Sequence, residues 1–298
     1  MRALDGEPQM LGGGLGGIAP GQWSDDTELA CAIALISSTG VDLRTEGALD
    51  AIAAEFSRWY ADEPPDIGVQ TRAVLSQHPT SAEDMRTAAR ELHERGERTA
   101  GNGSLMRTSP VALAHLGDSQ GIAQAARAVS ELTHHDPVAG DACVLWCLAI
   151  DLAVRTGRVD VRVGLPHVDA DYWAPLLDEA ENVEPAHYAI SNGWVVAALQ
   201  SAWSSVSRSS NLRSALIAAV QGGGDTDTVG AITGALAGAT YGGSAIPAAW
   251  SRMLHGWPGL RAPDLARLAY LTAHGGRASP QDGRSTIEAR LGSARSQV

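Results

Sequence analysis

The chain has 298 residues, 44% of them hydrophobic and 19% charged, a balance typical of globular proteins and not of disordered ones. Its 34 acidic residues outnumber 22 basic ones, all arginines, and the net charge of -12 argues against nucleic acid as a main partner, because such binding needs a basic face. Three cysteines do not make a disulfide framework, so we expect a reducing compartment, the cytoplasm.

Most of the chain shows the apolar spacing of amphipathic helices. In chain order, helices are expected at 27–36, 46–59, 81–92, 120–132, 137–154, 193–206, 212–220, 228–241, 246–254 and 263–272. One short strand is predicted at 159–163, where apolar and polar residues alternate. The sequence therefore predicts an all-α fold, a single compact orthogonal domain of roughly a dozen helices over residues 1–273, with a flexible tail at 274–298.

Two segments of the sequence are strongly apolar. Cys143 and Cys147 lie four residues apart in the helix expected at 137–154, so we expect two buried thiols on one helix face. The run at 229–246 is broken by glycines, and no cationic apolar leader opens the chain. We therefore expect neither a membrane span nor secretion.

Two clusters of carboxylates and hydroxyls precede apolar helical runs. They consist of Ser24, Asp25 and Asp26, and of Asp225, Asp227 and Thr228. Either cluster alone can be an ordinary N-cap, because such side chains accept hydrogen bonds from the first turn of a helix. Together they hold more carboxylates than two caps need, and their charges would repel if the helix starts met without a cation. Hard oxygen ligands suit Mg²⁺ or Mn²⁺, so a two-metal site is the second interpretation.

Glycines mark three further segments. In the helix expected after the second cluster, Gly230, Gly234, Gly238 and Gly242 leave one ridge without side chains, for which tight core packing is the simpler interpretation and ligand approach the alternative. The loop at 12–17 matches a dinucleotide-binding pattern by spelling, but no strand precedes it, so we expect a flexible loop.

The loop of Gly101, Asn102, Gly103 and Ser104 lies between two expected helices. Its glycines allow left-handed backbone and expose N–H groups, which can form a nest for a phosphate or a ribose, although interhelical turns use the same residues. His134 allows two interpretations, a solvated helix end and a ring that stacks on a nucleotide.

Taken in order, these motifs resemble those of the ADP-ribosylglycohydrolase family, which includes the dinitrogenase reductase-activating glycohydrolase. Residues 20–27 resemble the family's Thr-Asp-Asp-Thr segment, residues 101–107 its Gly-Asn-Gly-x-x-Met-Arg motif, and residues 223–228 its second metal motif. The segments at 133–137 and 192–196 match as well. The resemblance covers residues 12–272.

The resemblance implies an all-α fold that binds two Mg²⁺ (or Mn²⁺) ions in a cleft. The implied ligands are Ser24, Asp25 and Asp26 from one side and Asp225, Asp227 and Thr228 from the other, with Asp227 bridging. The implied contacts to ADP-ribose come from Gly101, Asn102, Gly103, Ser104 and His134. The implied activity is hydrolysis of the bond that joins ADP-ribose to arginine, serine or a related conjugate, with Asp25, Asp26 or Asp227 acting on the water. The implied partner is an ADP-ribosylated protein or conjugate, and we expect a monomer.

Two departures from the family pattern matter. Ser24 stands where the family has threonine, but the hydroxyl survives, so ligation is still expected. The family's first helix, which carries Gly-Asp-Ala-Leu-Gly and an acidic residue, has no clear match before residue 12, where Glu7 is a doubtful equivalent. This favours the alternative of a catalytically impaired ADP-ribose-binding or scaffold protein. A third possibility is a Mg²⁺ phosphohydrolase.

Overall fold

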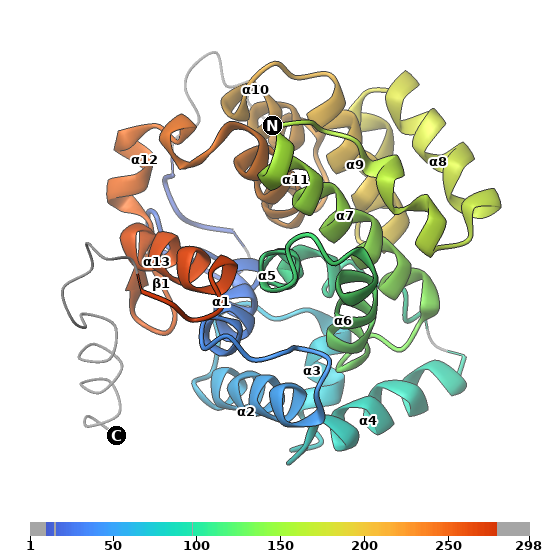
Figure 1. The fold of residues 1–298 in the computed structure, drawn as a ribbon, viewed down its shortest axis with the longest axis vertical. Helices are drawn as coiled ribbons and strands as arrows, with labels where there is room; N and C mark the ends of the chain where they lie inside the picture. Colours follow the sequence, from blue (N-terminus) through green and yellow to red (C-terminus); the bar gives the residue numbers. More distant parts are fainter. Residues whose placement is uncertain (1–9, 15, 97, 279–298) are drawn as a thin grey trace.

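The structure is a computed structural model that describes residues 10–14, 16–96 and 98–278 (Figure 1). The described α-helices are α1 (Asp25–Ser37), α2 (Glu46–Ala61), α3 (Val69–Leu75), α4 (Ala82–Glu94), α5 (Ser109–Ala114), α6 (Ser119–Glu131), α7 (Pro137–Thr156), α8 (Ala170–Asn182), α9 (Val195–Ser207), α10 (Leu212–Gly222), α11 (Thr226–Tyr241), α12 (Ala248–Met253) and α13 (Ala262–Ala273). They are joined by the 3-10 turns η1 (Leu105–Arg107), η2 (Val161–His167), η3 (Pro185–Tyr188) and η4 (Gly243–Ala245), and by the two-residue antiparallel strands β1 (His255–Gly256) and β2 (Leu260–Arg261). The predicted all-α class is confirmed.

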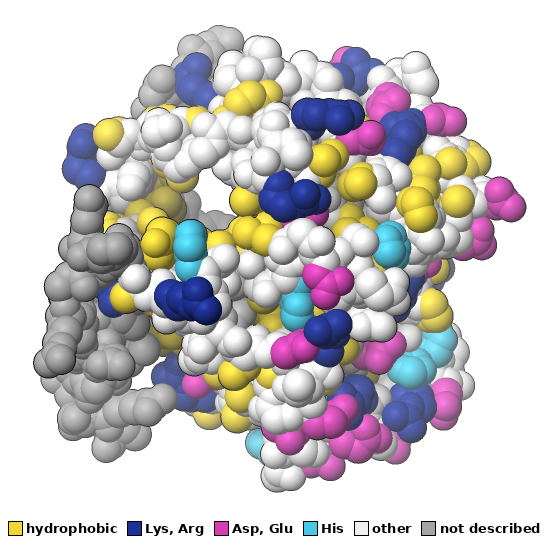
Figure 2. All heavy atoms as spheres, viewed as in Figure 1, with side chains coloured by type: hydrophobic (Ala, Val, Ile, Leu, Met, Phe, Trp, Pro, Cys, Tyr) yellow, Lys and Arg dark blue, Asp and Glu magenta, His cyan; other side chains and the backbone are white. Residues whose placement is uncertain are grey.

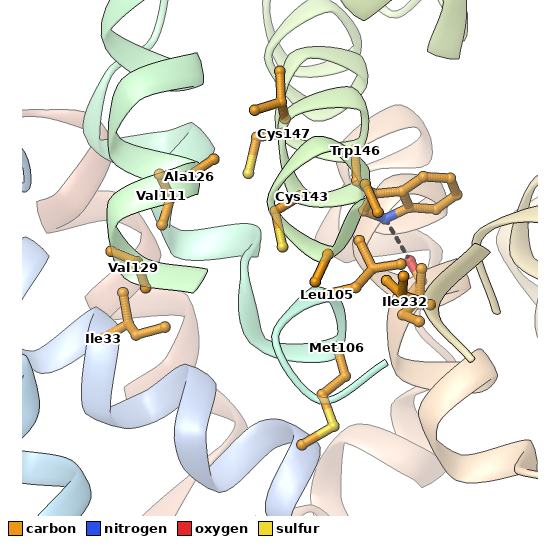
Figure 3. Close-up of a cluster of buried hydrophobic side chains, with 14 of the residues drawn as sticks. Ile33, Leu105, Met106, Val111, Ala126, Val129, Cys143, Trp146, Cys147 and Ile232 are labelled. Atoms are coloured by element: carbon orange, nitrogen blue, oxygen red, sulfur yellow. Dashed lines mark hydrogen bonds between the residues drawn. The ribbon is translucent and has the colours of Figure 1, made fainter. Parts of the chain in front are cut away.

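Helix α7 forms the centre of the domain and packs against α6, α9, α11 and η2. The Asp136 side chain accepts from the Val138 N–H at its start, and Gly157 ends it in the left-handed conformation. Trp146 donates its ring N–H to the Ile232 carbonyl of α11 at 3.0 Å (Figure 3). In length and composition α7 could cross a membrane, but 72% of its apolar window is buried inside the fold, which explains that apolar character.

Each predicted helix coincides with an observed one, but the strand predicted at 159–163 is wrong. Asp160 accepts from the Arg162 N–H and begins the 3-10 turn η2. This turn lies directly on α7, because a Cβ at Gly164 would stand 2.9 Å from the Leu145 Cα. The two free thiols of Cys143 and Cys147 are buried on α7 as predicted (Figure 3).

The glycine ridge of α11 is not tightly packed. A Cβ at Gly230 or Gly238 would meet no atom within 4 Å, and one at Gly234 would meet only the Leu216 Cδ2 at 3.3 Å. The core-packing interpretation is therefore wrong for Gly230 and Gly238. A cavity of about 240 Å³ lies between α1, α5, α11 and α13 and includes Ala235 in its wall. In Figure 2 a hollow rimmed by apolar side chains opens in this part of the molecule.

We expect Gly238→Ala to raise the free energy of unfolding by roughly 0.5–1 kcal/mol, because helical glycine is unfavourable and the new methyl group meets open space. Gly242→Ala is the control of opposite sign, since Gly242 ends α11 with φ +78°. Urea denaturation measures both changes. A destabilised Gly238→Ala would mean that this face of α11 is packed in solution.

The predicted boundary at 273 coincides with the end of α13, but most of the tail, residues 279–298, lies outside the described residues, as does Glu7. The division of the chain at residue 273 and the flexible tail remain predictions.

Candidate functional site

The first acidic cluster lies at the start of α1. Ser24 occupies the N-cap position, yet its side chain accepts no N–H from the helix. Its hydroxyl instead donates to the Asp26 Oδ2 at 2.5 Å. Asp225 likewise occupies the N-cap position of α11 without a side-chain capping bond. Neither cap residue does what the capping interpretation requires, so that interpretation is wrong for both of them.

The carboxylates of α1 are buried close to one another. Burial, with the charges of Asp66 and Asp227, raises the pKa of Asp25 to about 7. Burial and the charge of Asp25 raise the pKa of Asp26 well above its ordinary value. Asp26 is only 2% exposed, and its Oδ1 has no hydrogen-bond partner. A buried carboxylate oxygen without a partner is costly, and a bound cation would compensate it.

The second cluster faces the first. Asp227 is exposed, and its charge contributes to the raised pKa values of Asp25 and Asp26. The hydroxyl of Thr228 lies close enough to Asp26 to act against the rise in the pKa of that carboxyl. The starts of α1 and α11 are therefore neighbours, although they come from opposite ends of the chain.

Two asparagines hold Asp225 in place. Asn102 donates its side-chain amide to the Asp225 Oδ2 at 2.7 Å, and the Asp225 N–H donates to the Asn192 Oδ1 at 3.0 Å. Burial raises the pKa of Asp225, while the bond from Asn102 acts in the opposite direction. Asn102 thus links the glycine loop directly to the second acidic cluster.

The two acidic clusters offer carboxylate and hydroxyl oxygens, the kind of ligand that hard divalent cations prefer. Within the described ranges, no three carboxylate, imidazole or thiol groups converge at the spacing of a bound ion. The two clusters nevertheless offer only oxygens, and their carboxylates repel one another across the gap between α1 and α11. Together with the unpartnered oxygen of Asp26, this repulsion is what a positive ion would relieve.

The glycine loop is fastened to the start of α9. The Asn102 N–H donates to the Gly193 carbonyl at 3.1 Å, and the Val195 N–H donates to the Ala100 carbonyl at 2.9 Å. Residue 101 also pairs with Trp194 in a β-bridge. These bonds keep Trp194 extended as the N-cap residue, which is why α9 begins at Val195 and not at 193 as predicted.

Two of the five residues expected to contact ADP-ribose lie beneath this loop. His134 is 2% exposed, and its ring edge lies against Gly101 and Gly103. The solvated-helix-end interpretation is therefore wrong for His134. Ser104 is also buried, and the Cys143 thiol lies 3.5 Å from its hydroxyl. Gly101, Asn102 and Gly103 form the loop itself, and contact of all five residues with a ligand stays a prediction.

Four residues near the site were missed by sequence reasoning. Asp66 and Glu28 add carboxylates whose charges act on Asp25, and Glu28 accepts from the Trp59 ring N–H at 2.6 Å. Trp194 is an aromatic ring, 44% exposed, next to the glycine loop, and Ile190 is fully exposed nearby in the chain. Glu28 comes one turn after Asp25, a spacing that could have indicated it.

Comparisons with known proteins agree with these features. The sequence model described as ADP-ribosylglycohydrolase matches residues 2–279. The chain is 33% identical over 248 residues to the ADP-ribosyl-[dinitrogen reductase] glycohydrolase of Rhodospirillum rubrum, covering 81% of this chain and 76% of that protein. It is 28% identical to the ADP-ribosylarginine hydrolase Tri1 of Serratia proteamaculans (strain 568), with 81% of this chain covered and 65% of that one.

A human relative and a solved structure extend the comparison. The ADP-ribosylhydrolase ARH3 of Homo sapiens is 26% identical over 283 residues, with 79% and 75% of the two chains covered. A solved chain of an ADP-ribosylglycohydrolase-related protein complex superimposes with a TM-score of 0.69 at 27% identity, over 90% of this chain and 87% of that one. With a family model that spans nearly the whole chain and a relative above 30% identity, the chain belongs to the ADP-ribosylglycohydrolase family.

Proposed function

We propose that this protein is a metal-dependent hydrolase that removes ADP-ribose from a modified protein side chain or a related conjugate. The observation that carries the proposal is the meeting of two acidic clusters, with a buried and unpartnered oxygen on Asp26, beside a glycine loop. A scaffold without turnover has little use for carboxylates held at such electrostatic cost.

The proposed ligands are Ser24, Asp25 and Asp26 from the start of α1, and Asp225, Asp227 and Thr228 from the start of α11. Two Mg²⁺ or Mn²⁺ ions bound there would supply positive charge that orients the ribose hydroxyls and lowers the pKa of a water. Asp25, Asp26 and Asp227 are the carboxylates that would orient this water. Asp66 lies outside the ligand set, is half-buried, and adds a further carboxylate charge beside Asp25.

The positive charge that develops on the ribose carbon in an oxocarbenium-like transition state needs nearby negative charge. The α1 and α11 carboxylates provide it from opposite sides of the site. Asn102 belongs to the loop that would hold the ribose and phosphates and donates to Asp225, so it connects substrate binding to this group of acids.

The deciding experiment is a turnover assay on ADP-ribosyl-arginine and ADP-ribosyl-serine peptides, with and without Mg²⁺. The relative Tri1 is an ADP-ribosylarginine hydrolase, which favours arginine as the first substrate to test. We expect release that requires the metal. Tight binding of ADP-ribose without release would favour the scaffold function, and phosphate release from a nucleotide would favour a phosphohydrolase.

Trp194 is the aromatic surface that we expect the adenine base to use. Base stacking on an aromatic side chain is worth about 1–3 kcal/mol, so Trp194→Ala should raise the Kd for ADP-ribose by roughly 5- to 150-fold. Trp194→Tyr keeps an aromatic face and should lose much less. Isothermal titration calorimetry measures both, and an unchanged Kd for Trp194→Ala would place the base elsewhere.

A further inference from the structure

Arg107 is a fully buried cation with few partners. Its Nη2 donates to the Thr133 Oγ1 at 2.7 Å, while its Nε and Nη1 have no hydrogen-bond partner. Its guanidinium carbon lies 4.6 Å from the centre of the Phe56 ring. Burial lowers the pKa of Arg107 to about 10. An arginine buried with two unpaired nitrogen groups does not maximise stability, so its position calls for another reason.

The hydroxyl of Thr133 joins Arg107 to His134. Its oxygen lies 2.7 Å from the Arg107 Nη2 and 2.7 Å from the His134 Nδ1. Arginine can only donate, so this oxygen accepts from Arg107, and the single hydrogen of the hydroxyl is free to donate to Nδ1. A neutral imidazole that accepts at Nδ1 carries its hydrogen at Nε2. Burial, and the positive charge of Arg107, lower the pKa of His134 well below its ordinary value and keep the ring neutral.

The Nε2 of His134 lies against the glycine loop. A Cβ at Gly101 would stand 3.4 Å from this nitrogen, and a Cβ at Gly103 would stand 3.2 Å from it. Any residue larger than glycine would press on the ring edge at Gly103. Nε2 makes no protein hydrogen bond among the described residues, so its hydrogen is available to a ligand of the loop.

Gln70 supplies the complementary group on the same side of the loop. Its amide nitrogen donates to the Thr133 carbonyl at 2.9 Å, which fixes the direction of the amide. Its Oε1 is buried without a partner and lies 3.4 Å from the Cβ position of Gly101. An unused donor on His134 and an unused acceptor on Gln70 therefore both lie against Gly101. A hydroxyl group, which donates and accepts at once, matches such a pair.

We propose that Arg107 is a positioning residue which, through the Thr133 hydroxyl, holds His134 as the neutral Nε2–H form, so that this N–H serves as a donor to an oxygen of the ligand in the Gly101–Gly103 loop. The identity of that ligand as ADP-ribose rests on the proposed function. The proton arrangement itself does not, because it is a property of the free protein.

The first test is ¹⁵N NMR of the imidazole nitrogens in the ligand-free protein. The expected result is a protonated Nε2 and an unprotonated Nδ1 for His134 at neutral pH. Thr133→Val removes the hydroxyl and should shift the ring toward the Nδ1–H form, whereas Thr133→Ser keeps the hydroxyl and should retain Nε2–H. Arg107→Met should weaken the preference for the Nε2–H form of His134. Arg107→Lys, which can still donate to Thr133, should retain part of this preference. A wild-type ring protonated at Nδ1 overturns the proposal even if no variant folds.

The second test is the affinity for ADP-ribose measured by calorimetry. We expect Thr133→Val to raise the Kd by roughly three- to tenfold, the loss of about one hydrogen bond. Thr108→Val is the matched control, because it removes another buried threonine hydroxyl, one that contacts the Cys147 thiol and not His134. A Thr133→Val protein that keeps the wild-type tautomer and affinity contradicts the proposal. If the wild type does not bind ADP-ribose, the proposed function fails while the NMR result still decides the role of Arg107.

Discussion

Asp227→Asn is expected to lower metal-dependent release of ADP-ribose by at least about a hundredfold, because Asp227 is a carboxylate that would help hold the proposed ions. Asp227 is exposed and lies in the first turn of α11, so its replacement should leave the fold intact. The measurement is release of ADP-ribose from a modified peptide in Mg²⁺, with thermal unfolding to check the fold. Unchanged release would remove Asp227 from the proposed metal ligands.

Asp171→Asn is the matched control for this variant. Asp171 is the second residue of α8, just as Asp227 is the second residue of α11, and it is exposed as well. Both variants lose the same favourable interaction between an acid and the positive end of a helix, which is worth under about 1 kcal/mol at the surface. Only Asp227→Asn should also weaken Mn²⁺ binding in a titration followed by electron paramagnetic resonance. Equal effects of both variants would mean that Asp227 stabilises the helix and does not bind metal.

The helices are predictable because each buries one apolar face, and the spacing of apolar residues in the sequence indicates that face. The strand at 159–163 failed because its pattern is too short to outweigh the Asp160 cap and the contact of Gly164 with α7. The sequence pattern does not predict the short helices α3 and α5, nor the helix α8, which has Pro175 in its first turns. Proline and short length hide the periodicity on which such predictions rest.

The acidic clusters were visible in the sequence, but their meeting was not. It depends on α1 packing against α11 and on Asn102 and Asn192, which hold Asp225 from two loops distant in the chain. Local sequence does not indicate Asp66, because an aspartate after two prolines is typical of a surface loop. Its effect on Asp25 arises only when the chain after α2 folds back over the start of α1.

Burial of His134 is a second property that local sequence could not give. A histidine after a helix end, followed by Asp136 and a proline, is typical of a solvated turn. In the structure the glycine loop covers the His134 ring. The Thr133 hydroxyl forms a hydrogen bond with this ring, and Arg107 donates to the same hydroxyl. The family motif contains Arg107, but only the packing shows that this arginine contacts the Thr133 hydroxyl.

The second large effect concerns stability without metal. In chelator, we expect the free energy of unfolding to fall as pH rises from 6.5 to 8, and added Mg²⁺ to restore it. The pKa of Asp25 is raised from 3.8 to about 7 in the folded state, so the folded state binds more protons than the unfolded state at every pH between these values. Stability must therefore decrease as pH increases through this range, by about 1 kcal/mol from Asp25 between pH 6.5 and 8. The raised pKa of Asp26 acts in the same direction.

The buried histidines act with the opposite sign in the lower part of this pH range and partly offset the carboxylates there. His134 and His115 have lowered pKa values in the folded state, so their contribution to stability grows with pH until the unfolded histidines, whose pKa is about 6.5, have lost nearly all their protons at about pH 7.5. Above that value the carboxylates decide the slope. Asp25→Asn should flatten it, and Asp171→Asn should leave it unchanged. Because a cation favours the ionised carboxylates, Mg²⁺ should raise the melting temperature more at pH 8 than at pH 6.5. Stability in chelator that rises over this window would mean that the clusters of α1 and α11 do not repel each other in solution, and the argument for a cation between them would fail with it.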